Sequence, residues 1–242
     1  MTEILQNSIP YAPDWDARLP GIAPLAPDGW IIKDEAFAPQ MALRDRLIAQ
    51  SPNRVVANAG ASATAKSEVL DQVLAIIRNR AGYKVAPDHV QRPDGVLVQL
   101  TGDPLVTAAR LVQEDLCLHE KRGDQHVLTA AVLCFPASWT LAEKIGRPLR
   151  EVHDTVPEYD PQIATRVQRL FDGIQPDRPL WRYNIMRYRK PDLFHPRRMT
   201  DPREPNEGGD YLRSEHQALI RMPQSRAVLF AIHTYVIKQP LK

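Results

Sequence analysis

His153 is the residue whose type and surroundings point most directly to chemistry among the seven histidines of this 242-residue sequence. It lies in the segment RPLREVHDTVPEYDPQI, where Pro148, Pro157 and Pro161 restrict the backbone. A rigidly placed lone histidine suits the axial position of a large flat metal cofactor. Asp154 beside it could orient the imidazole ring. The alternative is that the prolines only shape a loop and His153 is exposed.

Basic residues gather between positions 178 and 203, where eight Lys or Arg accompany two Asp. Arg182, Arg187 and Arg189 fall in a predicted strand, and the others flank the following loop. Such a concentration can pair with anionic cofactor groups, bind phosphate or dock an acidic protein. A solvated basic face is the alternative. The net charge of the whole chain is only +2, which argues against nucleic-acid binding.

Acidic side chains adjoin apolar strands at two places. Gln113, Glu114 and Asp115 stand at a helix-to-strand junction, VQEDLCLH, and Glu215 lies within LRSEHQALIRMP. A strand carboxylate either faces water or faces a cavity, where it selects a cationic ligand such as an amine. Both interpretations remain open at this point.

Standard catalytic motifs are absent from the sequence, including a phosphate-binding glycine loop, a metalloprotease histidine pair and a nucleophile elbow. Cys117 and Cys134 are too few for a disulfide framework and lack metal-ligand spacing. The N-terminus does not have the pattern of a signal peptide, and no apolar run approaches the ~20 residues of a membrane span. We therefore expect a cytoplasmic protein. Its 43% hydrophobic and 25% charged residues are typical of a globular chain.

The elements that must position these residues can be predicted from periodicity and capping signals. Apolar residues at helical spacing predict helices over about 35–50, capped by Asp34, and about 64–81. Asp103, Ser138 and Asp160 mark further helix starts, and 147–159 is predicted to be mostly loop. The predicted strands cover residues 96–100, 116–119, 126–135, 181–189, 213–222 and 228–237.

From about residue 111 the order is two strands, helices and three strands, which is the element order of a PAS-like domain. We therefore expect an α+β fold with a PAS-like five-stranded antiparallel sheet and inserted helices over residues 101–242. A helical N-terminal arm and region, residues 1–100, would pack on it. No segment of disordered composition separates the two, so we expect one integrated unit.

Several of these segments together resemble the heme-dependent oxidative N-demethylase family. The matching stretches are VQEDLCLH, LCFPASW, KIGRPLREVHDTVPEYDPQI, RPLWRYN, LRSEHQALIRMPQSRAVLFAIHTYV and, upstream, LPGIAPLAPDGWIIKDEAF. The resemblance spans residues 18–237. It implies a PAS-like fold that binds heme b and, with oxygen, removes a methyl group from a small secondary alkylamine such as dimethylamine, releasing the demethylated amine and formaldehyde. It also implies electrons from a flavin/[2Fe–2S] partner chain, since two cysteines here cannot hold such a cluster.

For a heme pocket of this kind, strand positions and charges suggest roles for individual residues. His153 would be the axial ligand of the heme iron, because PAS-type heme sites take their histidine from the helical segment between the second and third strands. Arg213 and Arg182 would pair with heme propionates, and Glu215 would hold the amine cation. The strand alternatives for the axial ligand are His126, His216 and His233. The stretch around Arg187, Arg189 and Arg197 would dock an acidic electron donor.

Three positions depart from the family pattern. Ile185 stands where members commonly have Trp, and His216 and His233 stand where they commonly have Arg. These changes could alter propionate pairing or the distal pocket. The alternative function is therefore a non-catalytic heme- or ligand-binding PAS-like module, either a sensor or an inactive paralogue.

Overall fold

Two antiparallel sheets with flanking helices form the protein in a computed structural model that describes residues 3–12, 21–152, 161–202 and 209–239. All described strand pairings are antiparallel, so the predicted α+β class is confirmed. In spatial order, the main sheet contains β1 (Ala23–Pro24), β8 (Leu180–Tyr188), β9 (Tyr211–Arg221), β10 (Val228–Lys238), β6 (Asp115–Arg122), β7 (Gln125–Val132) and β2 (Val56–Asn58).

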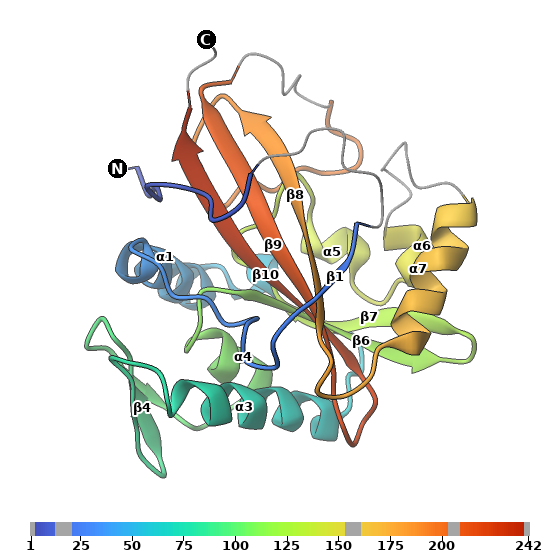
Figure 1. The fold of residues 1–242 in the computed structure, drawn as a ribbon, viewed down its shortest axis with the longest axis horizontal. Coiled ribbons are helices and arrows are strands. Elements are labelled where there is room, and N and C mark those ends of the chain that lie inside the picture. The colour runs from blue at the N-terminus through green and yellow to red at the C-terminus, as the bar shows by residue number, and fades with distance from the viewer. Residues whose placement is uncertain (1–2, 13–20, 153–160, 203–208, 240–242) are drawn as a thin grey trace.

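The five longest strands agree with strands predicted from the sequence. β6 and β7 form a hairpin whose register shifts between Leu118 and His119. β8, β9 and β10 run side by side, and β10 joins this group to β6 (Figure 1). The last strand along the described chain therefore lies in the middle of the sheet.

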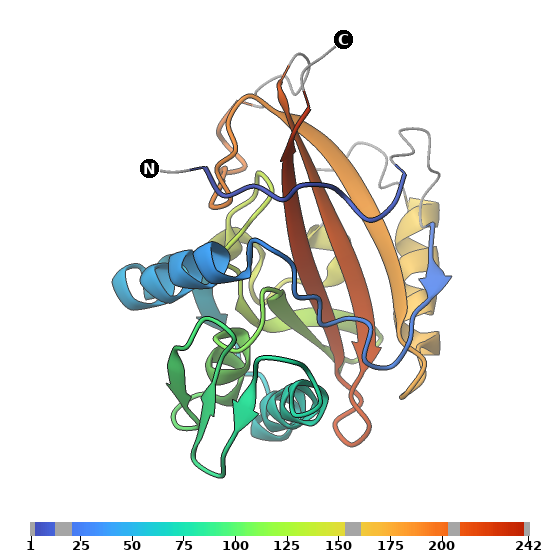
Figure 2. The same cartoon turned by 60° about the vertical axis from the view of Figure 1, so that its left-hand side comes forward.

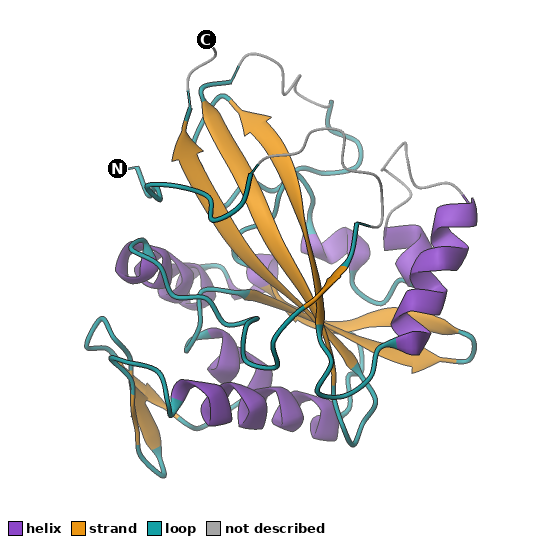
Figure 3. Ribbon diagram, in the orientation of Figure 1, coloured by secondary structure: helices purple, strands orange, loops and turns teal. Residues whose placement is uncertain are grey.

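Helices cover both faces of the main sheet (Figure 3). Successive strand residues point to opposite faces, so alternate residues pack against different helices. On the face we call the α3 face, Leu118 and Ala231 join one core cluster with Val69. On the opposite face, the α7 face, Leu219 and Val228 pack against Phe171. The helices are α1 (Phe37–Gln50), α2 (Pro52–Val55), α3 (Ala63–Ile77), α4 (Pro104–Ala109), α5 (Leu141–Lys144), α6 (Leu149–Val152) and α7 (Pro161–Gly173).

The helix starts confirm one capping prediction and correct two. Asp103 caps α4, and its carboxylate accepts from the backbone of Leu105. Asp34 is not the cap of α1, which begins after Ala36 without a side-chain cap. Ser138 does not cap α5 either, because its backbone has a φ of 61° and its hydroxyl contacts the Tyr188 hydroxyl at 2.9 Å. Asp160 lies outside the described residues.

The N-terminal region was expected to be helical apart from one strand over residues 96–100, and it contributes further strands as well. β3 (Lys84–Val85), β4 (His89–Gln91) and β5 (Leu97–Gln99) form a separate three-stranded sheet. β1 and β2 add to the two edges of the main sheet, which therefore has seven strands and not five. Of these short strands, β5 lies within the strand predicted over residues 96–100. The others, of two or three residues each, have too few alternating positions to be recognised from periodicity.

Figure 2 shows the N-terminal arm, residues 3–12, crossing the long strands β8 to β10. The arm is fixed to β10 at Gln6, whose backbone N–H donates to Val236 O at 2.9 Å. The Gln6 side chain accepts from the Val236 N–H at 2.8 Å. Within the described ranges, the helices are all too short or too polar to cross a membrane.

Candidate functional site

A group of polar side chains on the α7 face of β8, β9 and β10 is the candidate site. Asn184 and Thr234 both stand opposite Glu215, on the two neighbouring strands, and Arg182 stands opposite Gln217. Strand alternation places these residues on one face of the sheet. We call this group the Glu215 cluster; its members are Arg182, Asn184, Arg213, Glu215, Gln217 and Thr234.

Glu215 is the centre of this cluster and is only 5% exposed. Its Oε2 accepts hydrogen bonds from Asn184 Nδ2 at 2.8 Å and Gln217 Nε2 at 2.9 Å. Arg213 Nη2 lies 3.7 Å from the other oxygen, Oε1. Among the residues that the structure describes, no hydrogen bond reaches Oε1. One carboxylate oxygen is therefore fixed in place, and the other is available to a ligand.

Arg213 is anchored to the backbone. Its Nη2 donates to Phe135 O at 2.6 Å and its Nη1 to Leu193 O at 3.1 Å, and the residue is 1% exposed. The sequence expectation that Arg213 shares a face with Glu215 is met by the register. Its two terminal nitrogens nevertheless donate to backbone carbonyl groups of the protein, so Arg213 links Glu215 to the segment that follows β7.

Arg182 makes fewer hydrogen bonds to the protein than Arg213 does. Its Nη1 donates to Gln217 Oε1 at 3.1 Å, whereas its buried Nε has no hydrogen-bond partner within the described ranges. Desolvation lowers the pKa of this guanidinium, and the nearby Glu215 charge acts in the opposite direction. Arg213 Nε and Thr234 Oγ1 are similarly unpartnered. Buried polar atoms are normally hydrogen-bonded, so these atoms fit a bound anionic group such as a heme propionate.

The predicted iron ligand, His153, lies outside the described residues. Among the strand alternatives, His126 is on the α7 face, where its Nδ1 lies 2.9 Å from Gln168 Nε2. Burial, with the Arg221 charge as a second cause, lowers the pKa of His126, so its ring is neutral at pH 7. His216 and His233 are on the α3 face and do not share the face of Glu215.

His233 is part of a buried ionic group. Its Nδ1 lies 2.9 Å from Glu114 Oε1, and its Nε2 lies 3.0 Å from Asp34 Oδ2. Burial alone would lower its pKa, but the hydrogen bonds and charges of Asp34 and Glu114 outweigh burial and raise the pKa to about 9. Both ring nitrogens are therefore protonated at neutral pH, which excludes His233 as a metal ligand in this arrangement.

The three positions that depart from the family pattern are separated from the Glu215 cluster by the sheet. His216 stacks on Trp181 with 4.7 Å between ring centroids. Ile185 stands opposite Ser214 and so shares that face. The side chains at these three positions therefore lie on the face of the sheet opposite Glu215.

The junction residues Gln113, Glu114 and Asp115 are fully buried and serve the fold. Arg44 Nη1 lies 2.9 Å from Asp115 Oδ1. Glu114 Oε1 also accepts from the backbone of Ile32 at 2.8 Å. The sequence left open whether these acids face water or select a cationic ligand. Neither interpretation applies to them, because they are buried and their partners are protein groups.

Some arginines of the basic stretch between residues 178 and 203 donate hydrogen bonds to the protein's own backbone. Arg187 Nη1 donates to Gly209 O and Gln239 O at 3.2 and 3.0 Å, and Arg197 Nη1 donates to Asp201 O at 2.8 Å. Arg189 is exposed. Backbone carbonyl groups therefore fix the guanidinium groups of Arg187 and Arg197 in place without neutralising their charges.

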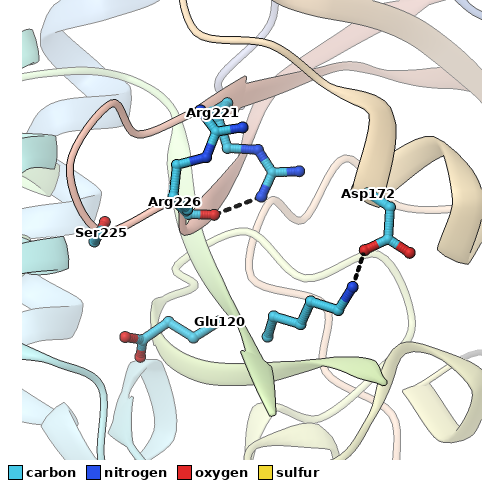
Figure 4. Close-up of a pocket in the computed structure, with 6 residues that line it drawn as sticks. Glu120, Asp172, Arg221, Ser225 and Arg226 are labelled. Atoms are coloured by element: carbon cyan, nitrogen blue, oxygen red, sulfur yellow. Dashed lines mark hydrogen bonds and ion pairs between the residues drawn. The ribbon is translucent and has the colours of Figure 1, made fainter. Parts of the chain in front are cut away.

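A polar hollow of about 290 Å³ lies near the end of α7 (Figure 4). Arg221 crosses it and donates to Ile174 O at 3.0 Å and to Phe171 O. Lys121 Nζ pairs with Asp172 Oδ1 at 2.6 Å. These internal pairings leave the hollow a weaker candidate than the Glu215 cluster.

A sequence model of the family described as "Haem-dependent oxidative N-demethylase, alpha subunit-like" matches residues 21–240. The chain belongs to this family. Its description supports dependence on heme and a general role in oxidative demethylation. The term alpha subunit further implies an oxygenase assembled from several subunits.

The charge of His233 predicts how stability depends on pH. The pKa of about 9 in the folded protein exceeds the ordinary 6.5, so the stabilisation is complete below pH 6.5 and is lost as pH rises through 9. The shift corresponds to about 3 kcal/mol. Urea unfolding across this pH range should show the loss in the wild type and not in His233→Gln. His89→Gln, at a more exposed site, is the control and should lose stability with pH as the wild type does. If the plots of unfolding free energy against pH run parallel for wild type and His233→Gln, the assignment is contradicted.

Proposed function

We propose that this chain is the heme subunit of a monooxygenase that removes a methyl group from a small secondary alkylamine such as dimethylamine. The observation that carries the proposal is the geometry of Glu215 in a chain of this family. Its buried carboxylate has one oxygen held by two amides and the other without a hydrogen bond from the described residues. An arginine nitrogen without a partner lies in the same cluster.

The proposed substrate explains why a carboxylate would stand in this place. A dialkylamine is a cation at neutral pH, and burying it without a counter-charge is costly. Glu215 Oε1 would accept the N–H of the ammonium group. Asn184 and Gln217 hold Oε2, so the carboxylate is already oriented before the amine arrives.

The proposed cofactor is heme b, which supplies the iron that activates oxygen for oxidation of the N-methyl group. Arg182 would pair with a propionate through its free Nε, and Arg213 would hold the strands beside it. His153 would bind the iron. One oxygen atom leaves in formaldehyde together with the methyl carbon, and two electrons and two protons convert the other to water.

The proposed structural frame for this cofactor is a PAS-like core within the larger sheet. In chain order, β6, β7, β8, β9 and β10 are its five strands, with α5, α6 and α7 between the second and third. Along the sheet they follow the order β7, β6, β10, β9, β8, and β1 and β2 are additions at the edges. The inserted helices pack on the face that carries Glu215.

Glu215→Gln tests the substrate assignment, because it keeps the size of the side chain and removes its charge. We expect the dimethylamine concentration at the midpoint of the heme spectral shift to rise about tenfold, which corresponds to about 1.4 kcal/mol. Heme content should be retained. Glu151→Gln, an exposed residue of α6, should leave the midpoint unchanged. An unchanged midpoint in Glu215→Gln would remove Glu215 from this role.

The axial ligand can be tested by absorption spectroscopy of His153→Ala after heme reconstitution. Loss of the imidazole should shift the Soret band and weaken heme binding, and added imidazole should restore the spectrum. His126→Ala, which removes the strand alternative on the same face as Glu215, should retain the wild-type spectrum. If His153→Ala keeps both the Soret position and the heme affinity, another residue binds the iron.

Electrons would come from a separate flavin/[2Fe–2S] partner that docks on the basic surface around Arg187, Arg189 and Arg197. Attraction between charged surfaces weakens as salt screens it. The rate of heme reduction by the partner should therefore fall as ionic strength rises, and Arg189→Gln should reduce that dependence. A salt-independent rate would exclude electrostatic docking here.

A further inference from the structure

A cleft of about 510 Å³ lies on the α3 face, where the N-terminal arm crosses β8, β9 and β10 (Figure 2). Six of its lining residues matter for what it could bind: Tyr11, Asp34, Glu35, Trp181, His216 and Tyr235. Trp181 is next to Arg182 along β8, and His216 is next to Glu215 along β9. Neighbouring residues of a strand point to opposite faces of the sheet. The cleft is therefore separated from the Glu215 cluster by the sheet.

Aromatic rings form much of the wall and support one another. Tyr11 stacks on Tyr183 with 4.4 Å between centroids and meets Tyr235 edge-on at 6.2 Å. Trp181 lies 5.7 Å from Tyr11 and stacks on His216. Because the faces of such rings are electron-rich, they attract organic cations.

The charges around the cleft have the matching sign. The carboxylates of Asp34 and Glu35 line it, and no Lys or Arg appears among its described lining residues. His233 behind Asp34 is cationic, but Glu114 on its other side offsets that charge. Burial lowers the pKa of His216 to about 4, and the charge of His233 contributes, so the His216 ring adds no positive charge. The cleft is therefore net negative.

One buried polar atom in the wall lacks a partner. His216 is 6% exposed, and its Nδ1 makes no hydrogen bond within the described part of the chain. Buried ring nitrogens are normally satisfied. Glu35, by contrast, is exposed and accepts one hydrogen bond, from the backbone of Asn7 at 2.6 Å. The wall thus contains an unpaired nitrogen beside aromatic faces and a carboxylate at its rim.

We propose that this cleft binds a small alkylated ammonium ion, at a site distinct from the Glu215 cluster. The ring faces of Tyr11, Trp181 and Tyr235 would contact the alkyl groups, and Glu35 would balance the charge. This site does not depend on heme or on the proposed reaction, because its residues lie on the opposite face of the sheet.

Calorimetric titration of the full chain with trimethylammonium chloride tests the proposal, with uncharged tert-butanol as the comparison of similar shape. We expect trimethylammonium to bind and tert-butanol to bind much more weakly. Trp181→Leu should weaken trimethylammonium binding about fivefold or more, as expected for loss of a cation–π contact. Glu35→Gln should weaken it about twofold to fivefold, as expected for an exposed ion pair.

Two further variants keep the test decisive. Trp181→Phe retains an aromatic ring and should bind more tightly than Trp181→Leu, which separates loss of binding from loss of folding. Glu215→Gln should retain the part of trimethylammonium binding that Trp181→Leu removes. Equal binding of tert-butanol, or binding that is lost in Glu215→Gln and kept in Trp181→Leu, would overturn the proposal and assign the ion to the other face.

Discussion

Three consecutive polar side chains at the start of β6 hold the architecture together. Gln113, Glu114 and Asp115 are fully buried, so each requires a partner. Gln113 Nε2 donates to Asp34 Oδ1 at 2.8 Å, which fixes the chain entering α1. Glu114 binds His233 of β10, and Asp115 binds Arg44 of α1. Removing one partner of such a buried ion pair typically costs about 3–5 kcal/mol, so this junction determines where the N-terminal region, α1 and the last strand meet.

From this junction the sheet extends with two chemically different faces. On the α7 face, Glu215 lies among Arg182, Asn184 and Gln217, so that face is polar and carries charges of both signs. On the α3 face, the adjacent positions place His216 against Trp181. A shift of register by one residue would exchange the two sets of side chains. The pairing of β10 with β9 over their whole length fixes the register and keeps the two faces distinct.

Long strands such as β7 and β10 could be predicted from the sequence because each is a run of mainly apolar residues rich in β-branched side chains. The common face of Arg213 and Glu215 also followed from alternation alone. The short strands β3 and β4 could not be recognised, since two or three residues show no readable period, whereas β5 lies within the strand predicted over residues 96–100. The partners of His233 could not be found either, because Asp34 is 199 residues away in the chain. The polar triplet Gln113–Asp115 between apolar runs was the available signal for that network, and it was interpreted only as a possible surface or ligand-selecting acid group.

The position of β10 has a consequence for biosynthesis. β10 lies between β9 and β6, although its residues, Val228–Lys238, are the last strand of the described chain. A ribosome delivers the chain from its N-terminus, so the β6–β7 hairpin and the β8–β9 pair emerge with no strand to join them. The nascent protein therefore holds two sheet fragments with open edges, which are prone to mispairing. Thr234 reaches its place beside Glu215 only when β10 inserts, so any ligand that needs both residues can bind only after β10 has left the ribosome.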